Sequence, residues 1–217
     1  MKHHDVGSMR HVAAILAALL ILSGPALAGP PLVCHPINIG SARSLPWSSS
    51  TWNLSGHERY DINHLVSDTL ALLAPNTPVL VRMETIRRAV LYSQTSPIVA
   101  KDLFNAVESR ATAHQSDALA VFDFGYLIET YGQADLAFRM SHRAPSGSEP
   151  FNPATGLDGY PWVKKAIRMR GQDPAMEFAA ALITTEISKR DYQGHVQMAK
   201  SGANEDPLLA LNIATHF

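Results

Sequence analysis

Apolar residues recur at every third or fourth position from Asp61 onward, which is the spacing of one helix face. Four of the expected helices begin where a capping residue precedes a proline: Thr77-Pro78, Ser96-Pro97, Asp173-Pro174 and Asp206-Pro207. In these pairs the first side chain can accept hydrogen bonds from free backbone N–H groups, and proline is tolerated in the first turn. Strand alternation bounded by tight-turn glycines is absent from the sequence. The pattern therefore predicts an all-α fold.

One run of apolar residues is longer than the others and lacks a polar face. It starts near Ser116 and is apolar nearly all round from Ala118 to Ile128, so we expect it to be the central helix. Gly125 in its middle would cost about 1 kcal/mol relative to alanine, unless another helix approaches there. A stretch rich in proline and glycine, residues 142–159, follows this helix and is predicted to be a connector loop.

The first 59 residues follow other patterns. Residues 1–28 combine two basic residues, an eleven-residue apolar run and a final Ala-Leu-Ala, which is typical of a secretory signal peptide cut after Ala28. The run is too short to span a bilayer, so we expect no membrane span after cleavage and a periplasmic or secreted protein. Residues 29–59 contain four prolines and two tryptophans without a regular period. They are predicted to form an irregular arm on the helical domain of residues 60–217.

Composition narrows the classes of function. The 18 Lys+Arg and 19 Asp+Glu residues give a formal net charge of −1, so the chain lacks the basic surface that nucleic-acid binding requires. The single cysteine, Cys34, cannot form an internal disulfide, which leaves a free thiol or a disulfide between two copies in a homodimer. Patterns such as Gly-x-Ser-x-Gly, His-Glu-x-x-His and Cys-x-x-Cys are absent, so no familiar catalytic motif indicates an enzyme.

Small residues and Asp-Pro borders occur at two places in spacings that helical repeats use. The first place holds Phe124-Gly125, Gly132 and Ala137. The second holds Asp173-Pro174, Asp191-Tyr192 and Asp206-Pro207, with borders 33 residues apart. In these segments the chain resembles tetratricopeptide or Sel1-like repeat proteins. The resemblance implies antiparallel helix pairs stacked as a superhelix, with a concave face that binds a peptide or protein. An irregular helical bundle explains the same periods without a repeat.

Three residues are candidate metal ligands: His57, Asp61 and His64. On a continuous helix, positions i, i+4 and i+7 lie on one face, and imidazole and carboxylate groups are ligands of zinc. If the helix instead begins at Asp61, this residue caps it and the three side chains separate. A divalent metal here is the one cofactor that the sequence indicates.

Cys34 and His35 form a second candidate site, a reactive thiol. A neighbouring histidine can lower the pKa of a thiol. Adjacent side chains of an extended segment point to opposite sides, which opposes such cooperation.

Acidic residues on apolar helices are candidates for buried charges: Asp123, Glu129 and Glu177. A buried carboxylate needs a cationic partner, and three arginines could supply it: Arg82, Arg87 and Arg88. Two carboxylates in one cleft could act as general acid and base of a hydrolase. Glu84 precedes Arg87 and Arg88 by three and four residues, so we expect a surface ion pair there.

Two functions follow from these observations. The first is an exported binding or scaffold protein, with a groove near Tyr126 and Tyr131 that holds a peptide, a protein or an envelope component. The alternative is an exported hydrolase that uses a metal at His57, Asp61 and His64, or the paired carboxylates. Several titratable groups in one closed pocket would favour catalysis, whereas an aromatic groove would favour binding.

Overall fold

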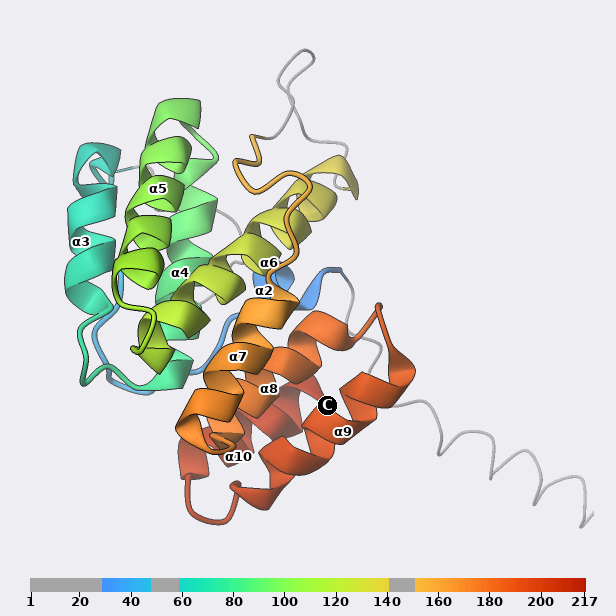
Figure 1. Ribbon diagram of the computed structural model, residues 1–217. Helices are drawn as coiled ribbons and strands as arrows, with labels where there is room; N and C mark the ends of the chain where they lie inside the picture. The colour runs from blue at the N-terminus through green and yellow to red at the C-terminus, as the bar shows by residue number, and fades with distance from the viewer. Residues whose placement is uncertain (1–28, 48–58, 141–150) are drawn as a thin grey trace, which may run out of the picture.

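The computed structural model describes residues 29–47, 59–140 and 151–217, and within these ranges the chain is all-α without a β-strand (Figure 1). The first elements are α2 (Pro31–Cys34), the 3-10 helix η1 (Ile62–His64), α3 (Leu65–Leu72), α4 (Val79–Ser93) and α5 (Pro97–Ala113). They are followed by α6 (Ala118–Met140), α7 (Tyr160–Arg170), α8 (Pro174–Thr184), α9 (Lys189–Ser201) and α10 (Pro207–His216). The expected signal peptide, residues 1–28, lies outside the described residues.

Local capping explains where three of the helices begin. The side chains of Ser96, Asp173 and Asp206 accept hydrogen bonds from backbone N–H groups in the first turns of α5, α8 and α10. These three predicted caps are confirmed. Thr77 is different, because its hydroxyl donates to the carbonyl oxygen of Leu72 at 2.8 Å and no side chain caps α4. The threonine thus closes the end of α3 and does not cap the start of α4.

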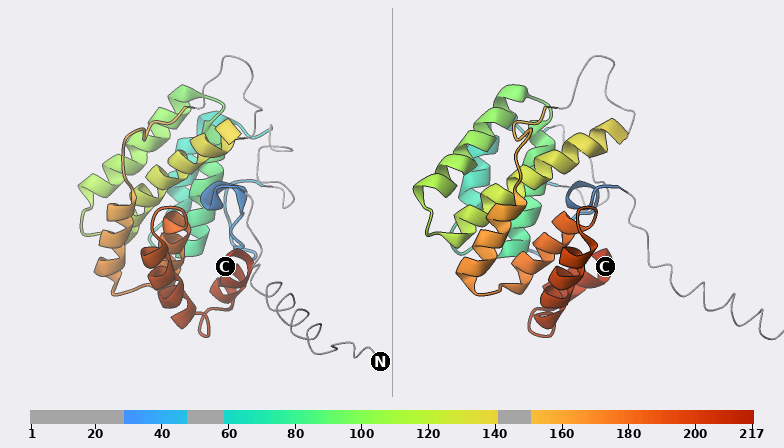
Figure 2. Two further views of the ribbon diagram at one scale, coloured as in Figure 1. Left: turned by 90° about the vertical axis from the view of Figure 1, so that its right-hand side faces the viewer. Right: turned by 45° about the vertical axis from the view of Figure 1, so that its right-hand side comes forward.

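Helix α6 is the central element, as its apolar sequence predicts. It contacts α2, α4, α5, α7 and α8 (Figures 1 and 2). A Cβ atom on Gly125 would lie 2.7 Å from both the carbonyl oxygen of Gly159 and the Cβ atom of Trp162. The glycine therefore allows α7 to approach, as expected. Helix α6 is continuous across Gly132, where the repeat resemblance places a turn.

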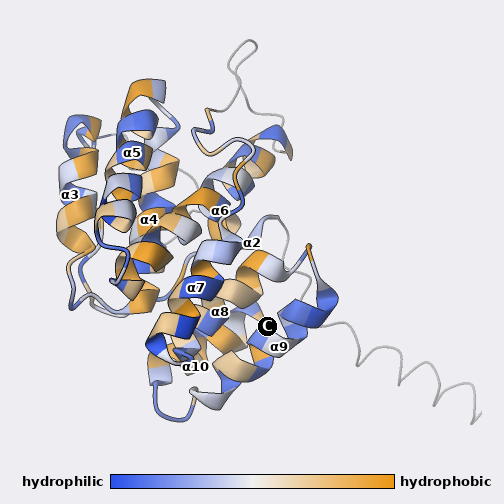
Figure 3. Ribbon diagram, viewed as in Figure 1, coloured by the Kyte–Doolittle hydropathy of each residue, from blue (hydrophilic) through white to orange (hydrophobic). Residues whose placement is uncertain are grey.

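The remaining helices lie on two sides of α6. Helices α3, α4 and α5 gather on one side, and α8, α9 and α10 gather on the other (Figures 1 and 2). Helix α8 is mostly buried, whereas α9 buries only Ala199 and is largely hydrophilic (Figure 3). Helices α8 and α9 form a packed pair between the Asp-Pro borders at residues 173 and 206. No helix in the described ranges is both long and apolar enough to cross a membrane.

The described part of the arm belongs to the core. Its buried apolar side chains are those of Leu32, Val33, Ile37, Ile39 and Leu45. Asn212 of α10 binds the backbone of Asn38 twice, because its Oδ1 accepts from the N–H and its Nδ2 donates to the carbonyl, both at 2.8 Å. The half-buried ring of Trp47 packs edge-on against Tyr92 at 5.7 Å between centroids. This arm therefore joins α4 to α10, and it contains the short helix α2 where the sequence predicts irregular chain.

Candidate functional site

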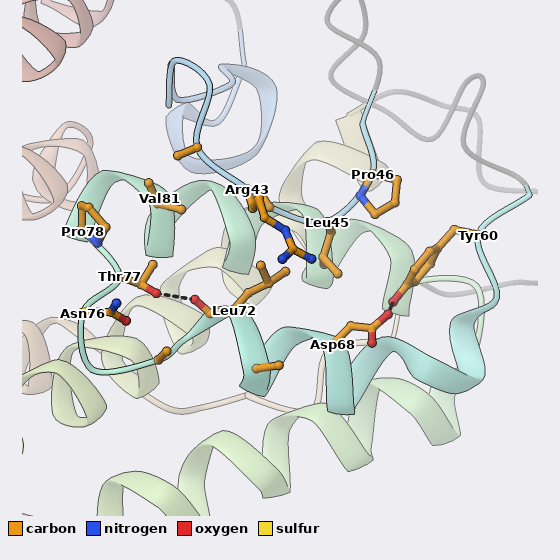
Figure 4. A pocket seen from close by; sticks show the side chains of 14 residues that line it. Arg43, Leu45, Pro46, Tyr60, Asp68, Leu72, Asn76, Thr77, Pro78 and Val81 are labelled. Atoms are coloured by element: carbon orange, nitrogen blue, oxygen red, sulfur yellow. Dashed lines mark hydrogen bonds between the residues drawn. The ribbon is translucent and has the colours of Figure 1, made fainter.

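A hollow of about 700 Å³ lies between the arm and the α3–α4 connection (Figure 4). Residues 42–46 of the arm form one wall, and residues 68–78 form much of the other. This volume falls within the range of sites that hold small ligands, roughly 300 to 1,000 Å³. We call this hollow the arm groove.

The arm groove carries opposite charges at separate positions. The exposed side chain of Arg43 extends over the hollow toward α3 (Figure 4), and it makes no ion pair within the described part of the chain. At one end of the hollow, the hydroxyl of Tyr60 donates to Oδ2 of Asp68 at 2.8 Å (Figure 4). Burial, together with this hydrogen bond, raises the pKa of Tyr60, so the hydroxyl remains a donor. The groove thus presents one cation and one oriented carboxylate.

A second polar group joins α7, α8 and α9. Nδ1 of His195 lies 2.5 Å from Oε2 of Glu177, and its Nε2 lies 2.8 Å from the hydroxyl of Tyr160. If Glu177 is ionised it can only accept, so we assign the proton to Nδ1, and Nε2 then accepts from Tyr160. Burial and the nearby charges of Asp191, Glu177 and Asp158 raise the pKa of Tyr160 to about 12. The tyrosine therefore keeps its proton, and the chain of hydrogen bonds positions α7 without supplying a nucleophile.

Glu129 holds the start of α7 from the other side. Its Oε1 accepts from the backbone N–H groups of Gly159 at 2.6 Å and Tyr160 at 3.1 Å. Burial raises the pKa of this carboxyl group. The residue thus acts as a helix cap supplied by a neighbouring helix.

The predicted buried charges have separate partners. Asp123 pairs with Arg82 at 2.6 Å, and both are fully buried. Glu129 binds backbone amides and Glu177 binds a histidine. Each carboxylate has a different partner, and Oδ1 of Asp123 is buried without a hydrogen bond from the described residues. The structure therefore does not bring the three together as paired catalytic acids.

The expected surface pair of Glu84 with Arg87 and Arg88 is corrected by the structure. Glu84 and Arg87 are fully buried, and Arg88 is mostly buried. The Glu84 carboxylate accepts from Arg87 at 2.8 and 2.9 Å and from Arg88 at 2.7 Å. It also accepts from the backbone N–H of Ile37 at 3.0 Å. The arm covers this face of α4, which is why it does not meet solvent.

The candidate metal ligands are only partly described, because His57 lies outside the described residues. Asp61 caps η1 by accepting from the backbone N–H of Asn63 at 3.0 Å. Nε2 of His64 lies 3.7 Å from Oδ2 of Asp61, and both side chains are more than half exposed. Among residues 29–47, 59–140 and 151–217, no three His, Cys, Asp or Glu side chains converge as a metal site would require.

The predicted reactive thiol does not gain a lowered pKa. Cys34 is half-buried at the end of α2, and burial raises the pKa of its thiol. His35 follows it, with its ring 6.3 Å from that of His216 in an edge-on arrangement. Desolvation of the thiol thus opposes the activation expected from a neighbouring histidine.

The groove expected at Tyr126 and Tyr131 is also corrected. Both rings are fully buried, because α6 is surrounded by other helices. The hydroxyl of Tyr131 lies 2.9 Å from that of Ser93 and 3.2 Å from the carbonyl oxygen of Ala100. Tyr126 stacks on Phe122 at 5.6 Å between centroids. Aromatic residues on α6 therefore belong to the core and not to a binding surface.

Sequence reasoning missed the arm groove. Part of its wall is formed by Asn76, Thr77 and Pro78, a segment that the sequence marks only as the expected start of a helix. Arg43 and Asp68 line the same hollow because the arm runs along α4 beside α3, which no local pattern indicates. Comparison with known proteins supplies no further guide, since no family model, curated protein or solved structure matches the chain.

Proposed function

We propose that this protein is a binding protein whose ligand is a short peptide with free termini, held in the arm groove. The observation that carries the proposal is that a cation without an ion pair in the described part of the chain, Arg43, and a carboxylate, Asp68, line the same hollow of about 700 Å³. A peptide with free termini carries the complementary charges at its two ends.

The chemistry of the two charged residues supports a peptide bound with its terminal carboxylate at Arg43 and its terminal ammonium group at Asp68. The planar guanidinium of Arg43 matches the geometry of a terminal carboxylate, with two parallel hydrogen bonds. Asp68 uses one oxygen to accept from Tyr60 and keeps acceptor capacity for a terminal ammonium group. Asn76 and the apolar side chains of Leu72 and Val81 lie along the groove for the middle of the peptide.

Export is part of the proposal. It rests on the sequence of residues 1–28, which has the charged start, apolar run and small-residue end of a signal peptide. Mass spectrometry of protein recovered from outside the cytoplasm is expected to find a chain that begins at Gly29. A chain that retains residues 1–28 would contradict export by this route.

The binding proposal is tested by calorimetry with tetra-alanine and with the same peptide acetylated and amidated. Free tetra-alanine is expected to bind, and the capped peptide to bind at least roughly tenfold more weakly, because both charged hydrogen bonds are lost. Arg43→Gln and Asp68→Asn should each weaken binding of the free peptide.

Matched controls separate the groove from general charge effects. Lys200→Gln and Asp102→Asn remove the same charges at exposed positions on α9 and α5 and should leave binding unchanged. Circular dichroism is used to confirm that each variant is folded. Equal binding of capped and free peptide, or no saturable binding of either, would overturn the proposal.

A further inference from the structure

Helix α7 concentrates positive charge in a chain whose formal net charge is −1. Its sequence, Tyr160–Arg170, contains four cations and neither Asp nor Glu. The helix lies on the outside of the bundle, where it contacts α6 and α8 (Figures 1 and 2). Arg170 is neutralised, because its Nη2 lies 2.9 Å from Oδ2 of Asp173. The other three cations make no ion pair within the described ranges, and we call them the basic stripe: Lys164, Lys165 and Arg168.

Helix geometry places the basic stripe on the side of α7 that faces away from the core. The buried side of the helix consists of Val163, Ala166 and Ile167. Residues three and four apart are neighbours on a helix surface, so Arg168 lies next to both lysines, and like charges at these spacings destabilise a helix. The helix dipole favours cations in the last turn, which holds Arg168 but not the two lysines. The stability of α7 therefore does not explain the stripe.

Aromatic rings hold the two lysines in place and leave their charge uncancelled. Nζ of Lys164 lies 4.3 Å from the ring centroid of Tyr160, and Nζ of Lys165 lies 6.0 Å from that of Trp162. Both lysines are half-buried, which is typical of side chains whose aliphatic stems pack against apolar surface. A ring attracts an ammonium group through its quadrupole but carries no net charge. The positive charge of the stripe therefore remains available to a partner.

The shape of this surface suits a broad anionic partner better than a small anion. No residue of the basic stripe lines the arm groove, and the outward side of a helix does not enclose a small ligand. The acidic residues close to Tyr160, Asp158 and Asp191, form no ion pair with the stripe. A planar anionic surface can contact all three cations at once, and clusters of Lys and Arg on an amphipathic helix bind bilayers that contain anionic lipids.

We infer that the basic stripe is a peripheral docking surface for a bilayer of anionic phospholipid, whose headgroup phosphates contact Lys164, Lys165 and Arg168. The stripe is separate from the arm groove, so this inference stands or falls independently of peptide binding. Export would bring the stripe to such a membrane, but binding to vesicles can be measured whether or not the chain is exported.

The test is sedimentation of the whole protein with two kinds of lipid vesicle. One kind is pure phosphatidylcholine, and the other is an equimolar mixture of phosphatidylcholine and the anionic phosphatidylglycerol. The parent is expected to prefer the mixed vesicles, and rising salt should reduce this preference because counterions screen the charges. In the triple variant Lys164→Gln, Lys165→Gln, Arg168→Gln the preference should fall roughly 100-fold, since each cation near such a surface strengthens binding roughly fivefold. Residues 1–28 are the same in every variant, so any binding through their apolar run is common to all.

A matched control removes the same net charge elsewhere. The triple variant Lys101→Gln, Arg190→Gln, Lys200→Gln, at exposed positions on α5 and α9, should keep most of the preference of the parent. Circular dichroism is used to confirm that both triple variants are folded. Equal losses in the two triple variants, or a parent without preference for the mixed vesicles, would contradict the inference. Binding of poly-glutamate by a parent that shows no such preference would assign the stripe to an acidic protein and would also contradict it.

Discussion

Two regions of the molecule bury polar groups in different ways. In the α4–α6 region, residues 79–140, fully buried charges face charges of opposite sign: Arg82 with Asp123, and Glu84 with Arg87. In the α7–α10 region, residues 160–217, the buried Asn212 and Thr184 bind backbone groups. The buried carboxylate of Glu177 there faces His195, which keeps 16% of its side chain exposed.

The packing of the helices explains the difference. Helix α4 contacts α2, α3, α5, α6 and α8, so its charged residues Arg82, Glu84 and Arg87 have no route to water. Helix α9 buries only Ala199, so its charged residues remain solvated. A change of charge should therefore be costly in the first region, where an opposite charge is left buried and unpaired, and mild in the second.

The largest effect is expected for Glu84→Gln. The substitution leaves Arg87 fully buried beside a neutral amide, which should lower the free energy of unfolding by about 3 to 5 kcal/mol. Urea unfolding measures the loss. Glu186→Gln, at an exposed position, should change the same quantity by less than about 0.5 kcal/mol. Similar losses in both variants would show that burial of the pair does not matter.

The junction between the two regions gives the next largest effect. In Gly125→Ala the new methyl group meets the backbone of Gly159 and the Cβ atom of Trp162, and this overpacking should cost about 1 to 3 kcal/mol. In Gly132→Ala, on the same helix, the methyl group meets nothing within 4 Å, so helix propensity should stabilise the protein by up to about 1 kcal/mol. Thermal unfolding of both variants distinguishes these signs. A gain in stability for Gly125→Ala would mean that α6 and α7 do not approach so closely.

Sequence patterns predicted much of the fold because helix capping depends on residues that are close together in the chain. Ser96, Asp173 and Asp206 cap helices through amides two or three residues away, so sequence spacing was sufficient. Gly125 indicated a close approach but could not identify α7 as the partner. Thr77 shows the limit even at short range, because a carbonyl five residues earlier competes for its hydroxyl.

The candidate site was harder to predict because it depends on contacts between distant segments. Spacing correctly placed Glu84 beside Arg87, but burial of the pair comes from the arm, where Ile37 donates to Glu84 and the carbonyl of Val33 accepts from Arg87. The arm groove likewise exists only because residues 42–46 lie along α4, opposite the α3–α4 connection. No periodicity within a helix contains that information.

A smaller effect is expected for Glu177→Gln in the α7–α10 region. The amide oxygen can still accept from Nδ1 of His195, and no charge is left buried and unpaired. The free energy of unfolding should therefore fall by only about 1 kcal/mol. The same urea assay as for Glu84→Gln gives a direct comparison. If the two variants lost equal stability, the distinction between the regions would be wrong.

The smallest effect concerns pH and His216. Burial lowers the pKa of His216 below its ordinary value of 6.5. As the pH falls below about 6.5, the unfolded chain takes up a proton at this position before the folded protein does, so stability is lost on acidification. Between about pH 7 and pH 5, the free energy of unfolding of the parent should therefore fall more steeply than that of His216→Phe. This direction of the pH dependence follows because His216 is buried in its neutral form. A histidine stabilised by a carboxylate would have the opposite effect, and the protein would lose stability as the pH rises. Parallel pH profiles for the two proteins would show that His216 does not titrate differently on folding.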